Sequence, residues 1–388
     1  MTTTHIPALR PATRQHGFTL VELMVAMVLG LVTTLIIAQV ITVSEGNRRT
    51  TTQGSDAQVN GSVGLYSLSR DLQMAGYGLI SHAAALGCPI KAKHGSADML
   101  DLTLAPVTIT NDASGNPTLR VLSAGRASFS VPMLLKADHG SSATAFSVVS
   151  TVGISEGDVV MAVPSAWSNA AWCSAFEVKS AAGSNPLSST SVPHEAGTNS
   201  WNQPASAGVA PSNAYVGDSA YLVNLGRMVL REYLVSNNNL IMRELQTDGT
   251  WSTEQVLASG IVTMRVLYGR DTSATRDGIV DVYDTTSPTN ADGWSRVLTV
   301  RIALVARSEQ RERNNADGEG VVTASDPVWD VGSATTVSGT TDCPDSDSRQ
   351  CLTLTIPRSS NTDTEWQHYR YKVYDTVVPL RNVLWSAT

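Results

Sequence analysis

The sequence predicts an α+β protein in which one long N-terminal helix precedes a large, antiparallel β-rich domain. Two observations support this class. A 26-residue apolar run, Phe18 to Val43, contains a single charged residue, whereas the chain beyond about residue 98 consists of short apolar runs bounded by turn residues. The first pattern is long enough for a membrane-spanning helix, and the second is typical of sheet strands.

Composition favours an exported chain over a cytosolic one. Of 388 residues, 42% are hydrophobic and only 16% are charged, and the formal net charge is −7. Ser, Thr, Asn and Gly fill the polar positions, as suits an envelope protein rich in strands. The acidic balance argues against nucleic-acid binding by the surface as a whole. We therefore expect no specific nucleic-acid partner, although basic and aromatic residues interleave in W-Q-H-Y-R-Y-K-V-Y near the C-terminus.

The polar segment before the apolar run differs from an ordinary signal peptide. It carries Arg10 and Arg14 and no acidic residue. The positive-inside rule therefore places it in the cytoplasm and the bulk of the chain across the membrane. An ordinary signal is cleaved after its apolar region, but no A-x-A-like site follows Val43. We expect the apolar segment to be retained as an anchor.

Glu22 lies inside the apolar run, where a carboxylate costs about 2.5–3.5 kcal/mol on insertion scales and needs a partner. The surrounding G-F-T-L-V-E resembles the class III signal of type IV prepilins and type II secretion pseudopilins. This resemblance implies that a prepilin peptidase cuts between Gly17 and Phe18, that the new Phe18 amine is methylated, and that Glu22 neutralises the amine of a neighbouring subunit during assembly. It also implies a leader over residues 1–17 and a transmembrane, filament-core helix over 18–43.

Residues 44–80 are expected to form the second half of the same helix, laid against a sheet. Gly46 and Gly54 weaken the expectation of an unbroken helix. Apolar residues then recur at steps of three and four along one face: Leu65, Leu68, Leu72, Ala75 and Leu79. Gly76 and Gly78 are expected to end the helix.

The β-rich domain is expected over residues 81–388. Two apolar segments flanking Ser236–Asn239 predict a hairpin. Alternation within Arg296–Arg307 and within Tyr369–Tyr374 predicts strands with one buried face. Two stretches rich in Ser, Asn, Pro and Gly or in charge, at about 182–214 and 309–344, are predicted to be long loops.

Several segments resemble the PilW family of minor type IV pilins. They are L-S-R-D-L-Q-M-A-G-Y at Leu68–Tyr77 and, in the C-terminal third, A-S-G-I-V-T-M-R-V-L-Y-G-R-D-T, D-G-I-V-D-V-Y, W-S-R-V-L-T-V-R-I-A-L-V-A-R-S and Y-R-Y-K-V-Y-D-T-V-V-P-L-R-N. The middle, roughly 100–250, resembles the family weakly. The fold implied is pilin-like, with the helix packed on a β-rich periplasmic domain.

The family resemblance implies a role in assembly, with no enzymatic activity, cofactor or metal. The expected function is to initiate or prime pilus assembly and to support twitching motility and adhesion. Implied partners are the major pilin, other minor pilins, the prepilin peptidase, the inner-membrane assembly platform and a tip adhesin. The expected location is the inner membrane, with one span and a periplasmic C-terminal domain, and then the pilus. A minor pseudopilin of type II secretion is the alternative.

Four cysteines are present: Cys88, Cys173, Cys343 and Cys351. Their spacing lacks the close pairs of zinc sites, and an even count in an exported chain favours disulfides. Three pairings are possible. Cys343 with Cys351 closes a short loop rich in turn residues, which leaves Cys88 with Cys173, and we favour this pairing.

Two further motifs are candidate functional sites. Gly153–Gly157 matches G-x-S-x-G, which would make the chain a membrane-anchored envelope hydrolase with Ser155 as nucleophile. A strand pattern follows where a nucleophile elbow requires a helix, so we expect a turn instead. Asp271, Asp277, Asp281 and Asp284 gather near a glycine but lack the alternation of an EF-type calcium loop, and a solvated acidic turn is expected.

Overall fold

The computed structural model describes residues 17–79, 83–95, 97, 100–112, 115–125, 131–140, 142–181, 186–197, 200–202, 215–312, 321–360 and 362–386, with no side-chain description for residues 45–54, 101 and 385–386. Most of the predicted leader, residues 1–16, lies outside this set, as do residues 203–214 and 313–320 of the two predicted loops. The chain divides into two compact units, Met1–Gln53 and Gly54–Thr388.

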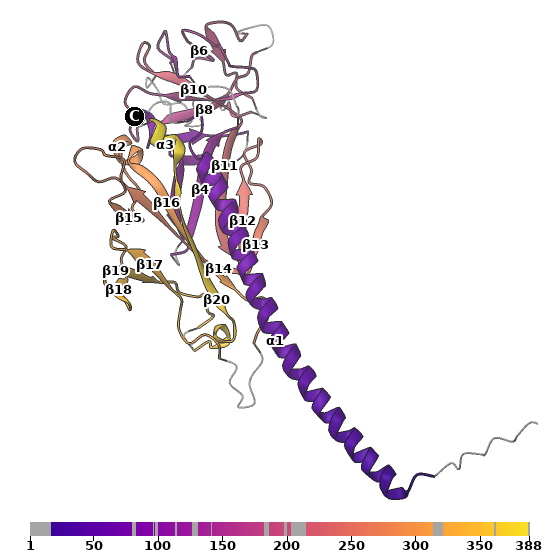
Figure 1. The fold of residues 1–388 in the computed structure, drawn as a ribbon. Coiled ribbons are helices and arrows are strands. Elements are labelled where there is room, and N and C mark those ends of the chain that lie inside the picture. The colour runs from indigo at the N-terminus through magenta and orange to yellow at the C-terminus, as the bar shows by residue number, and fades with distance from the viewer. Residues whose placement is uncertain are drawn as a thin grey trace, which may run out of the picture. The chain divides into compact units, whose positions relative to one another are not determined.

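The first element is α1 (Leu20–Met74), a 55-residue helix that begins in the first unit and ends in the second (Figure 1). The backbone is helical at Gly46 and Gly54, so the interruption that these residues made plausible does not occur. A glycine costs about 1 kcal/mol relative to alanine in a helix interior. A helix that is already nucleated tolerates this, because each added residue contributes a hydrogen bond.

The helix ends at Met74, earlier than the predicted residue 80. Gly76 and Gly78 follow with φ angles of 74° and 73°, in the left-handed region that favours glycine. The predicted role of these two glycines as the stop signal is therefore confirmed, and residues 75–79 are turns.

Two antiparallel sheets form the body of the second unit. The five-stranded sheet has the order β13-β12-β11-β4-β3 and the four-stranded sheet the order β15-β14-β16-β20. Their strands are β3 (Val107–Asn111), β4 (Pro117–Ala124), β11 (Met228–Ser236), β12 (Asn239–Glu244), β13 (Gln255–Ser259), β14 (Ile261–Arg270), β15 (Val282–Asp284), β16 (Val297–Arg307) and β20 (Tyr371–Pro379). The second unit also contains four short helical elements among its described residues: η1 (Ala83–Ala85), α2 (Ala291–Ser295), η3 (Glu365–His368) and α3 (Arg381–Ser386).

The predicted hairpin is confirmed. Ser236 of β11 pairs with Asn239 of β12. The two intervening residues, Asn237 and Asn238, have φ angles of 50° and 59°. Positive φ at both central residues is the requirement of the type I′ turn, which matches the twist of antiparallel strands.

Strand β16 is buried on both faces, which corrects the expectation of a single buried face. Val300, Ile302 and Leu304 join the main core between the helix and the sheets, while Ala303 and Val305 join a second core with Trp329. The second face is buried because a small sheet, in the order β17-β19-β18, covers it. These strands are β17 (Val328–Gly332), β18 (Thr340–Cys343) and β19 (Ser346–Thr353).

The predicted loops were wrong in part. β17 and β18 fall inside the 309–344 stretch, and β9 (Ser191–Pro193) falls inside the 182–214 stretch. These strands are only three to five residues long, which is too short to carry a readable alternation. Pairing with other strands holds them in extended form, because β17 and β18 both pair with β19, and β9 pairs with β6.

The described residues between 125 and 227 form an inserted lobe between the paired strands β4 and β11. Ala124 pairs with Met228 at the lobe's base, and the Gly125 N–H donates a hydrogen bond to the Arg227 carbonyl at 2.6 Å. The lobe therefore leaves and re-enters the sheet at one point. Its strands are β5 (Met133–Leu134), β6 (Ala145–Ser147), β7 (Val159–Val163), β8 (Cys173–Glu177), β9 and β10 (Tyr221–Gly226).

The strands of the inserted lobe pair around a closed circuit. Ladders join β6 with β9, β8 with β7, β7 with β10, and β10 with β5. Single bridges close the circle, between Leu135 and Val148 and between Lys179 and His194. Outside the lobe, β1 (Pro89–Ala92) joins β8 in parallel and pairs with β2 (Leu100–Thr103) on its other side. The lobe encloses a core of its own, separate from the main core.

A pair of histidines lies in the core of the inserted lobe. The Nε2 atoms of His139 and His194 are 2.8 Å apart, and the His139 ring stacks on Phe146 with ring centroids 3.7 Å apart. Burial lowers the pKa of His139 to about 4. Burial and the neighbouring His139 lower the pKa of His194 to about 3. Both rings are therefore neutral at neutral pH.

We predict that mild acid destabilises the protein through this pair. An unfolded histidine takes up a proton near pH 6.5, but the folded pair does so only near pH 4 and 3, so between these values the unfolded state binds more protons. Stability should be level above pH 6.5 and fall as the pH decreases, by on the order of 2 kcal/mol per histidine at pH 5.

The measurement is thermal unfolding at pH 7.5 and pH 5, a window in which most carboxylates stay ionised. His194→Gln should reduce the acid-induced drop in melting temperature. His368→Gln, a histidine outside the lobe, serves as the matched control. An equal drop in all three proteins would contradict the prediction.

Candidate assembly site

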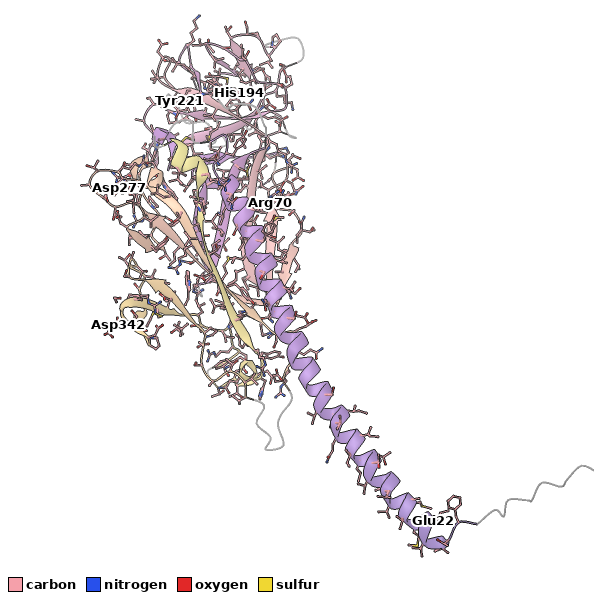
Figure 2. The ribbon with its side chains drawn as sticks, viewed as in Figure 1. Glu22, Arg70, His194, Tyr221, Asp277 and Asp342 are labelled. Atoms are coloured by element: carbon pink, nitrogen blue, oxygen red, sulfur yellow. A yellow bond between two sulfur atoms is a disulfide. The ribbon has the colours of Figure 1, made fainter. Side chains whose placement is uncertain are left out.

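The predicted cleavage and assembly residues lie together at the start of α1. Gly17 and Phe18 immediately precede the helix, and the Phe18 side chain is 84% exposed. Glu22 lies in the first helical turn, also exposed (Figure 2). One turn of chain thus presents the expected scissile bond, the residue expected to become the N-terminus, and the carboxylate.

Thr19 and Glu22 form a reciprocal capping arrangement. The Thr19 hydroxyl accepts a hydrogen bond from the Glu22 N–H at 3.2 Å, and the Glu22 carboxylate accepts one from the Thr19 N–H at 3.5 Å. This S/T-x-x-E capping box satisfies two otherwise free helix donors and holds the carboxylate at the positive end of the helix dipole. The sequence interpretation missed Thr19, although the spacing T-L-V-E signals it.

The first half of α1 is apolar on every side. The candidate membrane span is Leu20–Ser44, with a mean hydropathy of 2.5 and no buried residue. Its hydroxyl groups bond to the helix itself: Thr33 donates to the Leu29 carbonyl at 2.6 Å and Thr34 to the Gly30 carbonyl at 2.7 Å. These bonds satisfy the polar groups without water. Glu22 is therefore the one charged side chain within this described segment.

The second half of α1 has two distinct faces. Its buried face packs into the main core and comprises Ala57, Gly61, Gly64, Leu68 and Leu72. Its other face exposes an apolar stripe at steps of three and four, interrupted by Arg70, that comprises Val59, Val63, Tyr66 and Met74. The first face packs the helix against its own domain, and the second face is an apolar surface exposed to solvent.

Two glycines set how closely the helix approaches the sheets. A Cβ at Gly61 would lie 2.4 Å from the ring of Tyr374 in β20, and one at Gly64 would lie 3.2 Å from both Ala258 and Leu240. The first distance is shorter than any real contact. Gly61 is therefore required by the packing, and the sequence interpretation did not single it out.

An ionic cluster fixes the last turn of the helix. Asp71 accepts a 2.7 Å bond from Arg231 Nη1, and the Tyr233 hydroxyl donates to the same carboxylate oxygen. Arg231 also pairs with Glu244 at 2.9 Å. Burial and the bond to Asp71 raise the pKa of Tyr233 above its ordinary value, so the hydroxyl stays a donor. At the helix end, Asn382 donates a 2.8 Å hydrogen bond to the Ala75 carbonyl.

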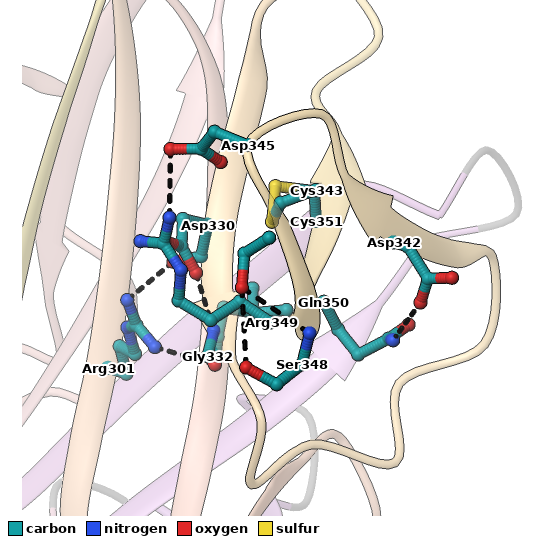
Figure 3. Close-up of a disulfide and its surroundings, with 12 residues drawn as sticks. Arg301, Asp330, Gly332, Asp342, Cys343, Asp345, Ser348, Arg349, Gln350 and Cys351 are labelled. Carbon is teal, nitrogen blue, oxygen red and sulfur yellow. Dashed lines mark hydrogen bonds and ion pairs between the residues drawn. A yellow bond between two sulfur atoms is a disulfide. The ribbon is translucent and has the colours of Figure 1, made fainter.

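The four cysteines form two disulfides, Cys88–Cys173 and Cys343–Cys351, the pairing that the sequence favours. The first joins the residue before β1 to β8 of the inserted lobe. The second lies in the small sheet, beside Arg349, which pairs with Asp330 and Asp345 (Figure 3). Asp330 approaches both sulfur atoms of this bond, but the sulfurs are bonded to each other and do not offer thiolate ligands.

Gly153–Gly157 forms a turn that leads into β7. Gly153 and Gly157 have φ angles of 87° and 84°, and the Ser155 N–H donates to the Asp158 carboxylate at 2.9 Å. No helix follows Ser155, so the strand-turn-helix geometry of a nucleophile elbow is not formed here.

The acidic turn is more buried than the sequence led us to expect. Asp271 is 1% exposed. Burial alone would raise its pKa, but hydrogen bonds from the Gly278, Ser273 and Asp277 N–H groups lower the pKa below its ordinary value. Asp284 is also buried and pairs with Arg270. Both carboxylates therefore serve to hold a loop.

The interleaved aromatic residues near the C-terminus contact cations of the same chain. Arg307 lies over the Tyr369 ring at 4.2 Å and Arg358 over the Trp366 ring at 4.5 Å. Such contacts stabilise the fold by cation–π attraction. Within the pattern itself, Arg370 pairs with Glu312 and Lys372 lies over the Tyr374 ring, so both basic residues have partners in the same chain.

Comparison with protein families gives two matches. Residues 12–38 match the prokaryotic N-terminal methylation motif, and residues 229–382 match PilW, the type IV pilus-assembly protein W. The chain is a PilW-like type IV pilin. Comparison with curated proteins and with solved structures gives no match.

The two family matches also indicate the cellular location of this PilW-like pilin. It is anchored in the inner membrane by its single N-terminal apolar helix, with the C-terminal domain in the periplasm. It is associated with the type IV pilus as a minor pilin. The matched segment begins at residue 229, directly after the inserted lobe, so the PilW similarity covers the four-stranded sheet and strands β11 to β13 of the five-stranded sheet, but neither β3 and β4 nor the lobe.

We predict that Asp71 is needed to hold the helix of this pilin in its domain. Asp71→Ala leaves the Arg231 guanidinium and the Tyr233 hydroxyl without their shared acceptor, which should cost about 1–3 kcal/mol of folding free energy. The measurement is thermal unfolding followed by tryptophan fluorescence. Asp56→Ala, an acid on the same helix with no such cluster, is the matched control. Equal melting temperatures of both variants would refute this role.

Proposed function

We propose that this pilin initiates or primes pilus assembly, and thereby supports twitching motility and adhesion. A prepilin peptidase removes residues 1–17 and methylates the Phe18 amine. The apolar half of α1 then leaves the bilayer and packs among the helices of the major pilin and other minor pilins. The inner-membrane assembly platform drives this transfer, and a tip adhesin is a further partner.

The observation that carries the proposal is the position of Glu22. The capping box with Thr19 holds its carboxylate at the very start of a helix that is otherwise apolar. In a filament core, an unpaired carboxylate would be strongly destabilising, by about 3–5 kcal/mol when one member of a buried ion pair is missing. The methylated amine of a neighbouring subunit supplies the opposite charge, so correct axial register is favoured.

The exposed stripe of α1 extends the proposed contact surface into the periplasmic domain. Tyr66 and Val59 are 70% and 56% exposed although they are large and apolar. They lie on the helix face opposite to the docked one, and exposed apolar stripes of this kind are typical of protein contacts. The pilus, rather than type II secretion, is favoured by the PilW match over residues 229–382.

Processing gives the first test. Intact-mass spectrometry of the protein from assembled pili should find a chain that begins at Phe18 and carries one added methyl group. Protein from cells without prepilin peptidase should retain Met1 and serve as the reference. A chain that still begins at Met1 in assembled pili would defeat the proposal.

The second test separates the charge of Glu22 from its capping role. Glutamine can replace glutamate in a capping box, so Glu22→Gln keeps the helix start and removes the charge, while Glu22→Ala removes both. Thr19→Ala removes the cap alone, at about 1 kcal/mol. Both Glu22 variants should be cleaved normally but enter pili poorly, whereas Thr19→Ala should enter them nearly as well as the native protein.

The readout is the amount of each variant in sheared pili relative to the amount processed in membranes. Normal incorporation of Glu22→Gln would show that the carboxylate charge is not the assembly contact.

A further inference from the structure

A cavity of about 350 Å³ lies at the base of the inserted lobe, where the lobe meets the β12–β13 connection. Three glycines at or near the junction, Gly125, Gly157 and Gly226, line the cavity and leave space there because they have no side chain. A Cβ at Gly157 would touch nothing within 4 Å. Six side chains supply its chemistry: Asp158, Glu177, Trp201, Arg227, Gln246 and Thr247.

Glu177 presents an unused acceptor. Its backbone is fixed on both sides by Asn202, whose Oδ1 accepts from the Glu177 N–H at 2.8 Å and whose Nδ2 donates to the Glu177 carbonyl at 2.7 Å. Its carboxylate, by contrast, pairs with no residue in the part of the chain that the structure describes. The carboxylate of Asp158 is already engaged, by Ser155 and Asn224.

Donors line the same cavity. Arg227 uses one nitrogen, Nη2, to bind Glu244 at 2.6 Å, and a guanidinium has five N–H donors in all. The indole N–H of Trp201 donates to no described residue. A buried aromatic side chain beside unused donors and acceptors is typical of a pocket that binds a small ligand.

The charge of the lining selects the ligand class. Asp158 and Glu177 outnumber Arg227, which is itself paired with Glu244, so the lining is net negative and disfavours anions. Among the lining carboxylates only Glu177 has no partner in the described part of the chain, and one carboxylate supplies too few oxygen ligands for a calcium or magnesium ion. A neutral polyol satisfies all three kinds of group, because hydroxyls donate to the carboxylate, accept from the guanidinium and indole, and pack their C–H faces on apolar surface. We propose that this cavity binds a neutral saccharide unit.

This binding site goes beyond the assembly role, which depends on α1. Only Gln246 and Thr247 among the six side chains fall within the PilW match. The site is therefore a property of the inserted lobe of this chain and would give its pilus a recognition specificity that the family match does not describe.

The test is saturation-transfer NMR on the full-length protein in a detergent without a sugar headgroup. The probes are glucose, galactose, mannose and N-acetylglucosamine, with glucuronate as the anionic counterpart. We expect at least one neutral probe to bind with a Kd of about 1 mM, as suits a ligand of this size, and glucuronate to bind at least about tenfold more weakly.

Two variants locate the site. Glu177→Gln keeps the shape and should weaken binding about tenfold by removing a charged acceptor. Thr247→Trp places a bulky side chain on an exposed loop at the cavity and should abolish binding without touching the core. Glu195→Gln, an acid of the same lobe outside the cavity, should bind as the native protein does. No binding of any neutral probe, or native affinity in either Glu177→Gln or Thr247→Trp, overturns the proposal.

Discussion

The packing of residues 57–72 of α1 against two sheets at once is the constraint on which the periplasmic unit depends. At Gly64 alone, the helix meets Leu240 of β12, Ala258 of β13 and Leu304 of β16. β12 and β13 belong to the five-stranded sheet and β16 to the four-stranded sheet, so the helix packs against both sheets within one shared core. At Gly61 the approach to Tyr374 is close enough to require glycine. The Asp71 cluster with Arg231 and Tyr233 fixes the register of the contact along the helix axis.

The same helix is built for two surroundings. Its first half has no polar face, and its threonine hydroxyls bond back to helix carbonyls, as suits an environment without water. Its second half has a docked face of small residues and leucines and an exposed stripe of larger apolar residues. The first half therefore suits apolar surroundings, whereas the second half packs one face on the sheets of its own domain.

Local features of the fold were readable from the sequence, whereas features made by distant contacts were not. The apolar length of the helix, its stop at Gly76 and the Asn237–Asn238 turn each depend on a few adjacent residues and were predicted. Gly61 was missed because its role depends on Tyr374, more than three hundred positions away. The two-sided burial of β16 was missed because the covering residues Trp329 and Val331 lie on a five-residue strand that is too short to be recognised.

In the candidate site, too, residues with local roles were predicted and residues that depend on distant contacts were not. Gly17, Phe18 and Glu22 form one contiguous signal, so their proximity followed directly from the sequence. Thr19 lies in the same G-F-T-L-V-E segment, but its role is to cap the helix and not to define the cleavage site, so it was missed. Asp71 could not be assigned, because its partners Arg231 and Tyr233 come from a strand about 160 residues further along.

The inserted lobe joins the sheet in a way that would allow one lobe to be exchanged for another. Its two ends meet at one hydrogen-bonded pair, Gly125 and Arg227, at the tip of the β4–β11 hairpin. A segment that starts and finishes at the same point can be exchanged for another without shifting the register of the strands beneath it. This junction is thus a point at which one inserted lobe could be replaced by another while the sheets that pack on the helix stay the same.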